Sequence, residues 1–365
     1  MPVSAIARGP VTSSNALRLE LAVPEDDRQL RELLHEMPMG ERIAVKFLRE
    51  PSFFQAKSVL GEQVQVIVGR RGGRIVGFGT RALRRSYING ELTRSGYLSD
   101  LRLIESERRG TSLARGYRFL REIHEQDPVD VYSTVIVEDN AAAIATIASG
   151  RAGLPMYTPL GRVLTPMIQL KRRLPEIEEH GQVVRGNDTM LPAIVDRLNE
   201  NRQQFAPIYK VEDFTAGRFP EFSPEDFYVL KRGNRIAAAG VWDQHAFRQT
   251  VIDGYGSWLK VARPLVNIAR RPKLPPPGTA LRYFNVSFVA TDDVDALAVL
   301  LRRIYNDAIG GPWSHFTIAL HERDPRKAVL QDYRKDNFAG RLYAVTFDGP
   351  PTLDDRVPHV DAGLL

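Results

Sequence analysis

The chain has 365 residues, of which 43% are hydrophobic and 26% charged, and this length and composition fit two ordinary globular domains. Its net charge of +6 is spread along the sequence, so we expect attraction to small anions, and no nucleic-acid partner is expected because no such motif is present. The absence of cysteine excludes disulfides, thiolate catalysis and cysteine-ligated zinc, and the scattered histidines predict no metal site.

No segment is apolar enough to span a bilayer, and the N-terminus lacks the layout of a signal peptide. We therefore expect a cytoplasmic protein without a membrane partner. Residues 1–16 are rich in Ser, Pro and Gly and are predicted to form a flexible arm.

The predicted elements of the first half alternate between strands and helices. A strand of alternating leucines and a helix with an acidic first turn are expected within residues 17–38. Residues 62–88 predict a hairpin that turns at Gly72-Gly73, and residues 96–105 predict a further strand.

Helical spacing returns over residues 111–126 and is followed by a predicted strand within residues 129–140 and an alanine-rich helix at 140–150. Because strands outnumber helices and two strands flank a helix, we expect an α/β (α+β) fold with a mixed sheet and helices on both faces. The residues predicted to share one face of the first of these helices are Leu113, Tyr117, Leu120 and His124.

The second half repeats the order of the first. The sequence "RRGGRIVGFG" at residues 70–79 parallels "KRGNRIAAAG" at 231–240, and a strand and a helix follow each. We therefore predict two tandem domains of one fold, at residues 17–175 and 185–350, with a C-terminal tail at 351–365.

A basic, apolar and Pro-rich insert, "SWLKVARPLVNIARRPKLPPPG", occupies residues 257–278. It is predicted to be an irregular connection packed on the sheet, with a lid or a surface for acidic partners as the alternatives.

The stretch "ESERRGTSLARG" at residues 105–116 lies between a predicted strand and a predicted helix. The first backbone N–H groups of a helix lack intrahelical partners and carry about half a positive charge, so they bind phosphate without specific side chains. Small residues at Gly110, Ser112 and Ala114 let the backbone approach an anion, and the Ser112 hydroxyl is expected to donate a further hydrogen bond. The stretch predicts a phosphate cradle, with an ordinary basic strand–helix turn as the alternative.

Residues 97–146 resemble the GNAT superfamily of acyl-CoA-dependent N-acyltransferases. The family signature is Arg or Gln, two residues, Gly, one residue, then Gly or Ala, and residues 109–114 match it with Ser112 in place of the first motif glycine. A second signature, Asn-x-x-Ala, is matched by residues 140–143. The resemblance implies that the protein binds acetyl-CoA or another acyl-CoA through both motifs and through the backbone of the strand before the loop. The strand residues are Arg102, Leu103 and Ile104, the loop residues are Arg109, Gly110, Thr111, Ser112, Leu113 and Ala114, and the second motif contributes Asn140.

Acyl transfer to an amine needs a base for the amine, a polarised thioester oxygen and a proton for the leaving thiolate. Asp100, on the strand that leads to the loop, is the candidate base, with a surface carboxylate as the alternative. The proton-donating Tyr that the family often places seven residues after the motif Asn is replaced by Ile147. Tyr157 is the candidate substitute, and a packed aromatic side chain is its alternative. No nucleophile stands out, so we predict direct attack without a covalent enzyme intermediate.

The second half has "ATDDVDALA" at residues 290–298 where the first half has its basic loop. These acids suit a helix start but repel phosphate, so the second half is expected to shape the acceptor site. The sequence thus predicts an N-acyltransferase that moves an acetyl or other acyl group to an amine of a small molecule or peptide. A non-catalytic acyl-CoA sensor and a tRNA-dependent aminoacyl transferase are the alternatives.

Overall fold

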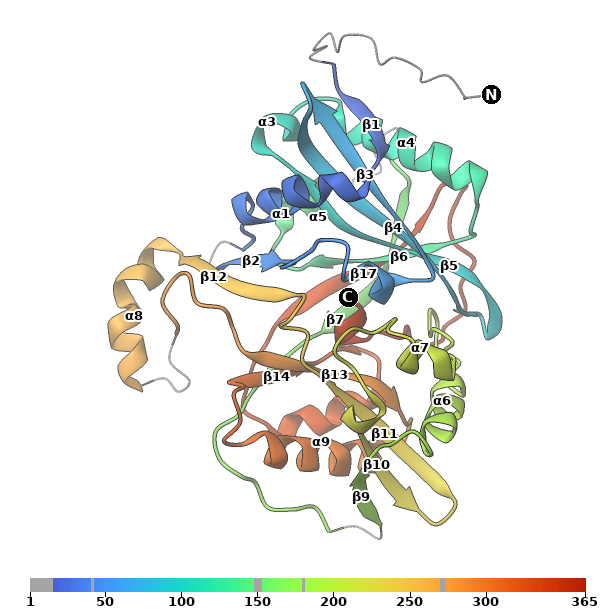
Figure 1. Cartoon of the computed structure of the whole chain (residues 1–365), viewed down its shortest axis with the longest axis vertical. Helices are drawn as coiled ribbons and strands as arrows, with labels where there is room; N and C mark the ends of the chain where they lie inside the picture. The colour runs from blue at the N-terminus through green and yellow to red at the C-terminus, as the bar shows by residue number, and fades with distance from the viewer. Residues whose placement is uncertain (1–15, 41–42, 148–152, 179–180, 270–273) are drawn as a thin grey trace, which may run out of the picture.

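The computed structural model describes residues 16–40, 43–147, 153–178, 181–269 and 274–365. The predicted N-terminal arm lies almost wholly outside these residues. The chain forms two stacked halves, and the C-terminal residue lies between them (Figure 1).

The elements of the first half are β1 (Arg18–Leu21), η1 (Pro24–Asp26), α1 (Asp27–Glu36), β2 (Ile43–Leu48), α2 (Lys57–Leu60), β3 (Gln63–Arg71), β4 (Arg74–Ile88), β5 (Glu91–Leu103), α3 (Glu105–Arg108), α4 (Ser112–Gln126), β6 (Tyr132–Val137), α5 (Ala141–Ile147), β7 (Met156–Leu164) and β8 (Met167–Gln169). Those of the second half are β9 (Gln182–Arg185), α6 (Leu191–Asn199), α7 (Val211–Thr215), η2 (Pro224–Asp226), β10 (Phe227–Arg232), β11 (Arg235–Trp242), β12 (Gln249–Tyr255), α8 (Ser257–Ala269), β13 (Tyr283–Ala290), α9 (Val294–Ala308), β14 (His315–Ile318), β15 (Leu320–His321), η3 (Pro325–Asp332), β16 (Lys335–Asp336), β17 (Ala339–Thr346) and η4 (Ala362–Leu364).

Two mixed sheets form the framework. The first has 8 strands in the order β1-β3-β4-β5-β6-β17-β7-β15, and the second has 7 strands in the order β16-β8-β14-β13-β11-β10-β9. Each predicted glycine turn closes a hairpin, since Arg71 pairs with Arg74 and Arg232 pairs with Arg235. The predicted α/β fold with two mixed sheets is confirmed.

Helices cover both faces of each sheet. Residues of β3 alternate between the faces: Val66 and Val68 pack with α1, whereas Ile67 packs with α4. In the second sheet, neighbouring residues of β10 do the same, because Leu230 packs with α9 and Val229 packs with α6. The long α4 lies along the top of the first sheet in Figure 1.

The repeat extends to an irregularity in the central strands. Opposite Phe78 and Thr80 of β4, β5 carries one extra residue, and opposite Ala238 and Gly240 of β11, β13 does the same. Each bulge holds a non-glycine residue with positive φ, which is Asp100 (φ 59°) in β5 and Phe288 (φ 53°) in β13. The two halves therefore share a backbone detail that the sequence alignment does not reveal.

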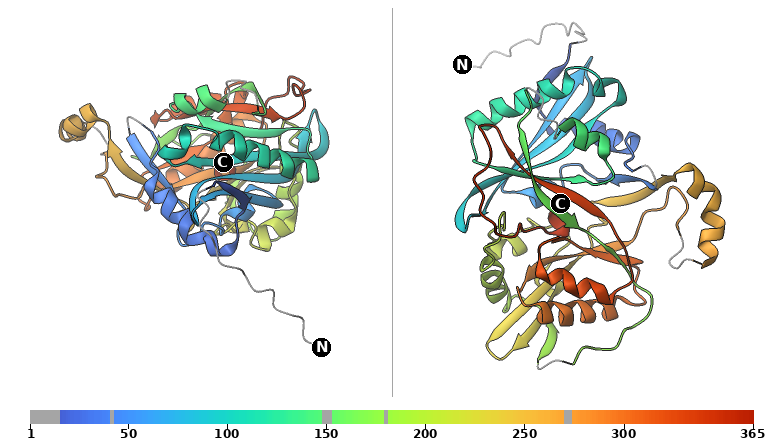
Figure 2. Two further views of the ribbon diagram at one scale, coloured as in Figure 1. Left: turned by 90° about the horizontal axis from the view of Figure 1, so that it is seen from above. Right: turned by 180° about the vertical axis from the view of Figure 1, so that it is seen from behind.

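The sheets exchange strands between the predicted domains. β8 lies within residues 17–175 but pairs with β14 and β16 of the second sheet. β17 lies within residues 185–350 but is inserted between β6 and β7 of the first sheet, as the red strand in Figure 2 (right) shows. The two halves are interlocked, and a cut between the predicted domains would not separate the sheets.

The insert and the tail differ from expectation. Residues 257–269 form the helix α8, which stands away from both sheets at the edge of the molecule (Figures 1 and 2), so an irregular connection packed on the sheet is wrong for this segment. The C-terminal tail is packed between the halves, where Leu364 joins the core around Trp242 and Phe288.

Candidate active site

The predicted phosphate cradle is an uncapped helix start. α4 begins at Ser112, and its N-cap residue Thr111 makes no side-chain capping bond. Because the first main-chain bond of the helix runs from the Arg115 N–H to the Thr111 oxygen (2.9 Å), the N–H groups before Arg115 have no intrahelical acceptor. Gly110 (φ +131°) has open space around it and a backbone conformation that other residues rarely adopt. Residues 109–111 are exposed, so an anion can reach the cradle.

A carboxylate lies beside this cradle. The Ser112 hydroxyl donates to Glu107, and the Arg71 Nε donates to the same carboxylate at 2.6 Å. These two hydrogen bonds hold the pKa of the buried Glu107 below its usual range. The Ser112 hydroxyl is therefore engaged within the chain, and we correct the expectation that it donates to a phosphate.

The sheet opens next to the cradle. β5 and β6 pair in parallel only at Gly96 with Tyr132 and at Tyr97 with Ser133, although both strands continue beyond these residues. Beyond these pairs, the Leu98 oxygen accepts from the Thr134 hydroxyl of β6 at 2.7 Å, and the Leu103 oxygen accepts from the Arg108 side chain at 3.2 Å. The backbone of Ile104, which the resemblance implies would bind acyl-CoA, is engaged within the chain, because its N–H donates to the Val76 oxygen and its oxygen accepts from the Glu107 N–H.

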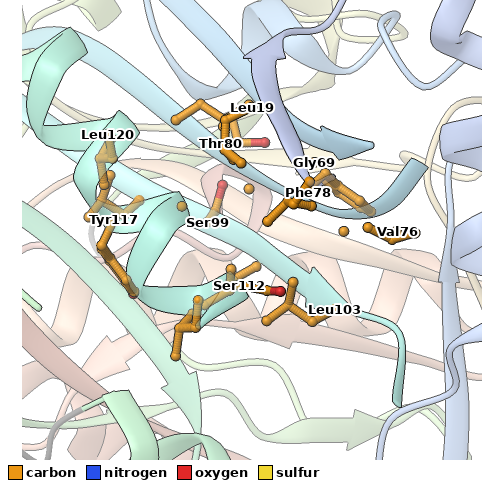
Figure 3. Close-up of a pocket in the computed structure, with 18 residues that line it drawn as sticks. Leu19, Gly69, Val76, Phe78, Thr80, Ser99, Leu103, Ser112, Tyr117 and Leu120 are labelled. Atoms are coloured by element: carbon orange, nitrogen blue, oxygen red, sulfur yellow. The ribbon is translucent and has the colours of Figure 1, made fainter. Parts of the chain in front are cut away.

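A largely apolar pocket lies under α4 and adjoins the cradle (Figure 3). Its empty space of about 670 Å³ includes space that is open to solvent. Its polar groups are the hydroxyls of Thr80, Ser99, Ser112 and Tyr117. The aliphatic side chains of the wall come from β1, β3, β4, β5 and α4, and they are Leu17, Leu19, Ile67, Val76, Leu98, Leu101, Leu103, Leu113 and Leu120.

Glycines create part of this space. Gly69 and Gly79 lie on paired strands and have no positive φ, whereas Gly77 is explained by close packing, because a Cβ there would come within 2.5 Å of Leu103 Cδ2 and 2.7 Å of the Arg102 oxygen. Gly116 faces the pocket from α4, and a Cβ placed there would meet no heavy atom within 4 Å. A glycine inside a helix costs stability, so open space at Gly116 is consistent with a binding role.

Asp100 lies in a charged cluster next to the pocket. Its carboxylate accepts from the Arg49 Nη2 at 2.8 and 2.7 Å and from the Thr80 hydroxyl at 3.1 Å. Burial raises the pKa of this carboxyl, but the charges of Arg49, Arg102 and Arg248 outweigh burial and lower it. A carboxylate held as an anion by an arginine is a weak base, and this geometry does not favour the predicted role of Asp100 as the general base.

Tyr157 lies on β7, three strand positions from β5, which is roughly 14 Å across a sheet. Its hydroxyl lies 2.5 Å from the hydroxyl of Tyr117, which lines the pocket. Burial raises the pKa of Tyr157 well above its usual value, so the phenol stays protonated at neutral pH. The structure thus does not bring Tyr157 and Asp100 together, but it links Tyr157 to the pocket through Tyr117.

Asn140 has a structural role in the chain itself. Its side-chain oxygen accepts from the Ala143 N–H at 3.1 Å at the start of α5, while the structure gives its amide nitrogen no partner among the described residues. Ile147, where the family often has tyrosine, ends α5. The second signature therefore marks a helix cap next to β6, and a cofactor contact from its amide stays a prediction.

The equivalent helix of the second half is closed to anions. At the start of α9, the Asp293 side chain accepts from the N–H groups of Asp295 and Ala296. The backbone donors that are uncapped in α4 are thus already used in α9, and a carboxylate occupies the position of an anion. This geometry agrees with the prediction that the second half does not bind CoA.

No group of three or more His, Cys, Asp or Glu side chains is placed to hold a metal ion in the described part of the chain. No described helix is both long and apolar enough to cross a membrane.

Sequence reasoning found the cradle but missed the pocket and Arg49. The pocket could have been suspected from Gly69 and Gly79, which lie within the strands of a hairpin and away from its turn. Arg49 gave no signal, because it is 51 residues from Asp100 in the sequence.

Comparisons with known proteins support the fold. No family matches the sequence, and no curated protein matches it. Among solved structures, the N-myristoyltransferase of Saccharomyces cerevisiae, crystallised with myristoyl-CoA, is similar over 95% of this chain and 82% of its own, with 14% identity and a TM-score of 0.59. A conserved protein of Enterococcus faecalis, described as a probable N-acyltransferase, is similar over 91% of this chain and 73% of its own, with 8% identity and a TM-score of 0.48. The chain has the tandem GNAT-like fold, in which the second half repeats the fold of the first.

Proposed function

We propose that the chain is an N-acyltransferase that takes its acyl group from acyl-CoA and holds that group in the pocket under α4. The observation that carries the proposal is the adjacency of two features, an uncapped helix start for the diphosphate and an apolar pocket for the acyl chain, which share Ser112 and Leu113. The similar yeast enzyme was solved with an acyl-CoA, which supports the same class of ligand here.

The pocket favours a medium or long acyl chain over acetyl. An acetyl group would leave most of the apolar wall without a partner, whereas each buried methylene contributes about 0.8 kcal/mol, or roughly fourfold in affinity. The substrate preferred by the pocket is therefore a fatty acyl-CoA, and the acceptor is an amine of a small molecule or peptide.

The reaction we propose is direct. The amine nitrogen attacks the thioester carbon, the carbon–sulfur bond breaks, and the thiolate leaves with a proton that the amine has lost. Positioning in the pocket and hydrogen bonds to the thioester oxygen supply the acceleration, as expected where no enzyme nucleophile is available.

Binding is tested by calorimetry with non-hydrolysable thioether analogues of acyl-CoA of increasing chain length. We expect affinity to rise about fourfold per methylene until the pocket is full. Gly116→Phe should fill the pocket and abolish this rise, whereas Gly116→Ala should leave it intact and serve as the folded control, because its Cβ meets no atom within 4 Å. Equal affinity for acetyl and long-chain analogues would contradict the proposed pocket function.

Turnover is tested separately by thiol release with a panel of amines and N-terminal peptides. A second candidate, a binding protein that senses acyl-CoA, is favoured by the engagement of Asp100 with Arg49 and of Tyr157 with Tyr117. Tight binding of long-chain acyl-CoA without thiol release on any amine would favour the sensor. Thiol release that depends on the amine would favour the transferase.

A further inference from the structure

The helix α8 presents an exposed apolar stripe. Four of its large apolar side chains are strongly exposed, at 59% for Trp258, 81% for Val261, 71% for Leu265 and 78% for Ile268. Their spacing of three, four and three residues places them on one face of a helix. Single exposed apolar side chains are common on proteins, but four along one face form a patch that indicates a binding surface.

Contacts on its other side anchor α8. Leu259 is buried, with 3% of its surface exposed. The Asn267 side chain donates to the Leu274 oxygen at 3.1 Å and accepts from the Leu274 N–H at 2.7 Å. The helix is thereby tied to the chain that follows it, and the stripe is held outward.

The charged residues of α8 and its flanking segment in the sequence have one sign. No Asp or Glu occurs between Asp253 and Asp292 in the sequence. Within α8, Lys260 is exposed, and the guanidinium of the half-buried Arg263 lies 5.8 Å from the ring centre of Tyr255. Residues 270–273 lie outside the described residues and are not part of this surface.

The position of α8 leaves the stripe accessible. The helix follows β12, which pairs with β2 in a separate sheet of 2 strands, and it projects beyond both halves (Figures 1 and 2). The rest of the molecule therefore does not prevent α8 from touching a flat surface.

We propose that α8 docks the protein on the surface of an anionic lipid bilayer. The side chains of Trp258, Val261, Leu265 and Ile268 enter the interface, and the exposed Lys260 contacts the anionic headgroups, whereas Arg263 lies on the opposite face of α8 against Tyr255. An aliphatic stripe with a tryptophan, cations and no acid is the composition of interfacial helices. The proposal departs from the sequence expectation of no membrane partner, and it does not rest on the acyltransferase function.

Charge argues against a second copy of the chain as the occupant of the stripe. Residues 254–291 carry basic side chains and no carboxylate, so a second copy of α8 offers Lys260 no opposite charge within this segment. An anionic bilayer supplies the complementary charge.

Vesicle flotation of the full chain tests the proposal. Vesicles of phosphatidylcholine with about one third phosphatidylglycerol should bind the protein at low salt, and vesicles of phosphatidylcholine alone should bind it about fivefold more weakly, because a cation such as Lys260 near an anionic surface contributes about fivefold. High salt should reduce binding to the anionic vesicles. Lys260→Glu should weaken it by at least fivefold.

Matched variants separate the stripe from the rest of the surface. Val261→Ser with Leu265→Ser should weaken vesicle binding at least tenfold without changing the melting temperature, since both side chains are exposed. Phe338→Ser, which removes another exposed apolar side chain (41%) away from α8, is the control and should bind vesicles normally.

Tryptophan fluorescence reports insertion directly. Trp242 is fully buried and the Trp313 indole donates to Asp243 at 2.8 Å, so Trp258 is the tryptophan whose surroundings change most on docking. Its emission should shift to the blue with anionic vesicles, and Trp258→Phe should bind vesicles while losing the shift.

Three results would overturn the proposal. They are no flotation with anionic vesicles at low salt, equal flotation with neutral vesicles, and a concentration-dependent dimer in analytical ultracentrifugation that Leu265→Ser abolishes in the absence of vesicle binding. None of these results depends on acyl-CoA binding, so they leave the proposed function untouched.

Discussion

The pairing of Arg49 with Asp100 shows how one contact changes the interpretation of a residue. Viewed in the sequence, Asp100 is a carboxylate before a phosphate loop. In the structure it occupies the bulge of β5 with a left-handed backbone, and an arginine from the segment after β2 neutralises it. The contact could not be predicted because no local pattern links positions 51 residues apart.

Removing Arg49 alone should therefore be costly. Arg49→Leu leaves the Asp100 charge largely buried and unpaired, and it should lower the free energy of unfolding by roughly 3 kcal/mol in urea denaturation. The double variant Arg49→Leu with Asp100→Asn should recover part of the loss, and asparagine is chosen because it tolerates the left-handed backbone. If the double variant is less stable than Arg49→Leu, the pair is not the source of the effect.

The same asparagine variant tests the chemistry of Asp100. If Asp100 only positions the bulge, Asp100→Asn should lower stability while thiol release per folded molecule stays within a few-fold. A fall of about 10²-fold or more with unchanged acyl-CoA affinity would restore Asp100 as the general base.

At the scale of elements, the starts of α4 and α9 differ in the backbone donors that they leave free. Both helices follow a bulged strand, but Asp293 caps α9 while the Thr111 side chain does not cap α4. The sequence predicted this difference because capping depends on residues next to the helix start. It also predicted the two hairpins and α4, whose periodic patterns are local.

Asn140 distinguishes a structural cap from a cofactor contact. Asn140→Asp keeps the oxygen that accepts from Ala143, so stability should hold, while it removes the amide donor and adds a negative charge. If the amide contacts acyl-CoA, calorimetry should show at least tenfold weaker binding. Asn140→Ala is the control for the cap and should cost about 1 kcal/mol in stability. Unchanged affinity in Asn140→Asp would assign Asn140 to the cap alone.

The elements that the sequence missed depend on distant partners. "SHFTIALHE" reads as one strand, yet β14 pairs in the second sheet and β15 pairs in the first. The helix α8 was missed because Pro264 and the prolines that follow suggest an irregular segment. The pocket was missed for a related reason, since its walls come from five elements.

For the whole molecule, the exchange of strands predicts that neither half folds alone. β17 pairs with β6 and β7, so a fragment of residues 1–175 would expose both strands. We expect this fragment to aggregate when expressed alone and to form a soluble complex when co-expressed with residues 176–365, as measured by size-exclusion chromatography. A soluble, cooperatively unfolding fragment 1–175 would contradict the expectation.

Stability should also depend on pH through a buried histidine. His315 stacks on Tyr283 between the strands of the second sheet, and burial lowers its pKa to about 4. The unfolded chain takes up the proton near pH 6.5, so the unfolded state binds more protons between these values, and stability falls as the pH decreases from about 6.5 to about 4, by up to about 1.4 kcal/mol per unit.

His315→Gln should remove this part of the pH dependence. The difference in unfolding free energy between the parent and the variant should shrink steadily below pH 6.5 in urea titrations. A difference that stays constant from pH 7 to pH 4.5 would show that His315 does not contribute.

The position of β17 sets the order of events during synthesis. About 200 residues separate Val137, the last residue of β6, from Ala339, the first of β17. At ordinary translation rates of 5–20 residues per second, a nascent chain waits roughly 10–40 s on the ribosome before the first sheet can be completed. During that interval the first half has two unpaired strand edges, and completion of its sheet depends on the arrival of β17 from the second half.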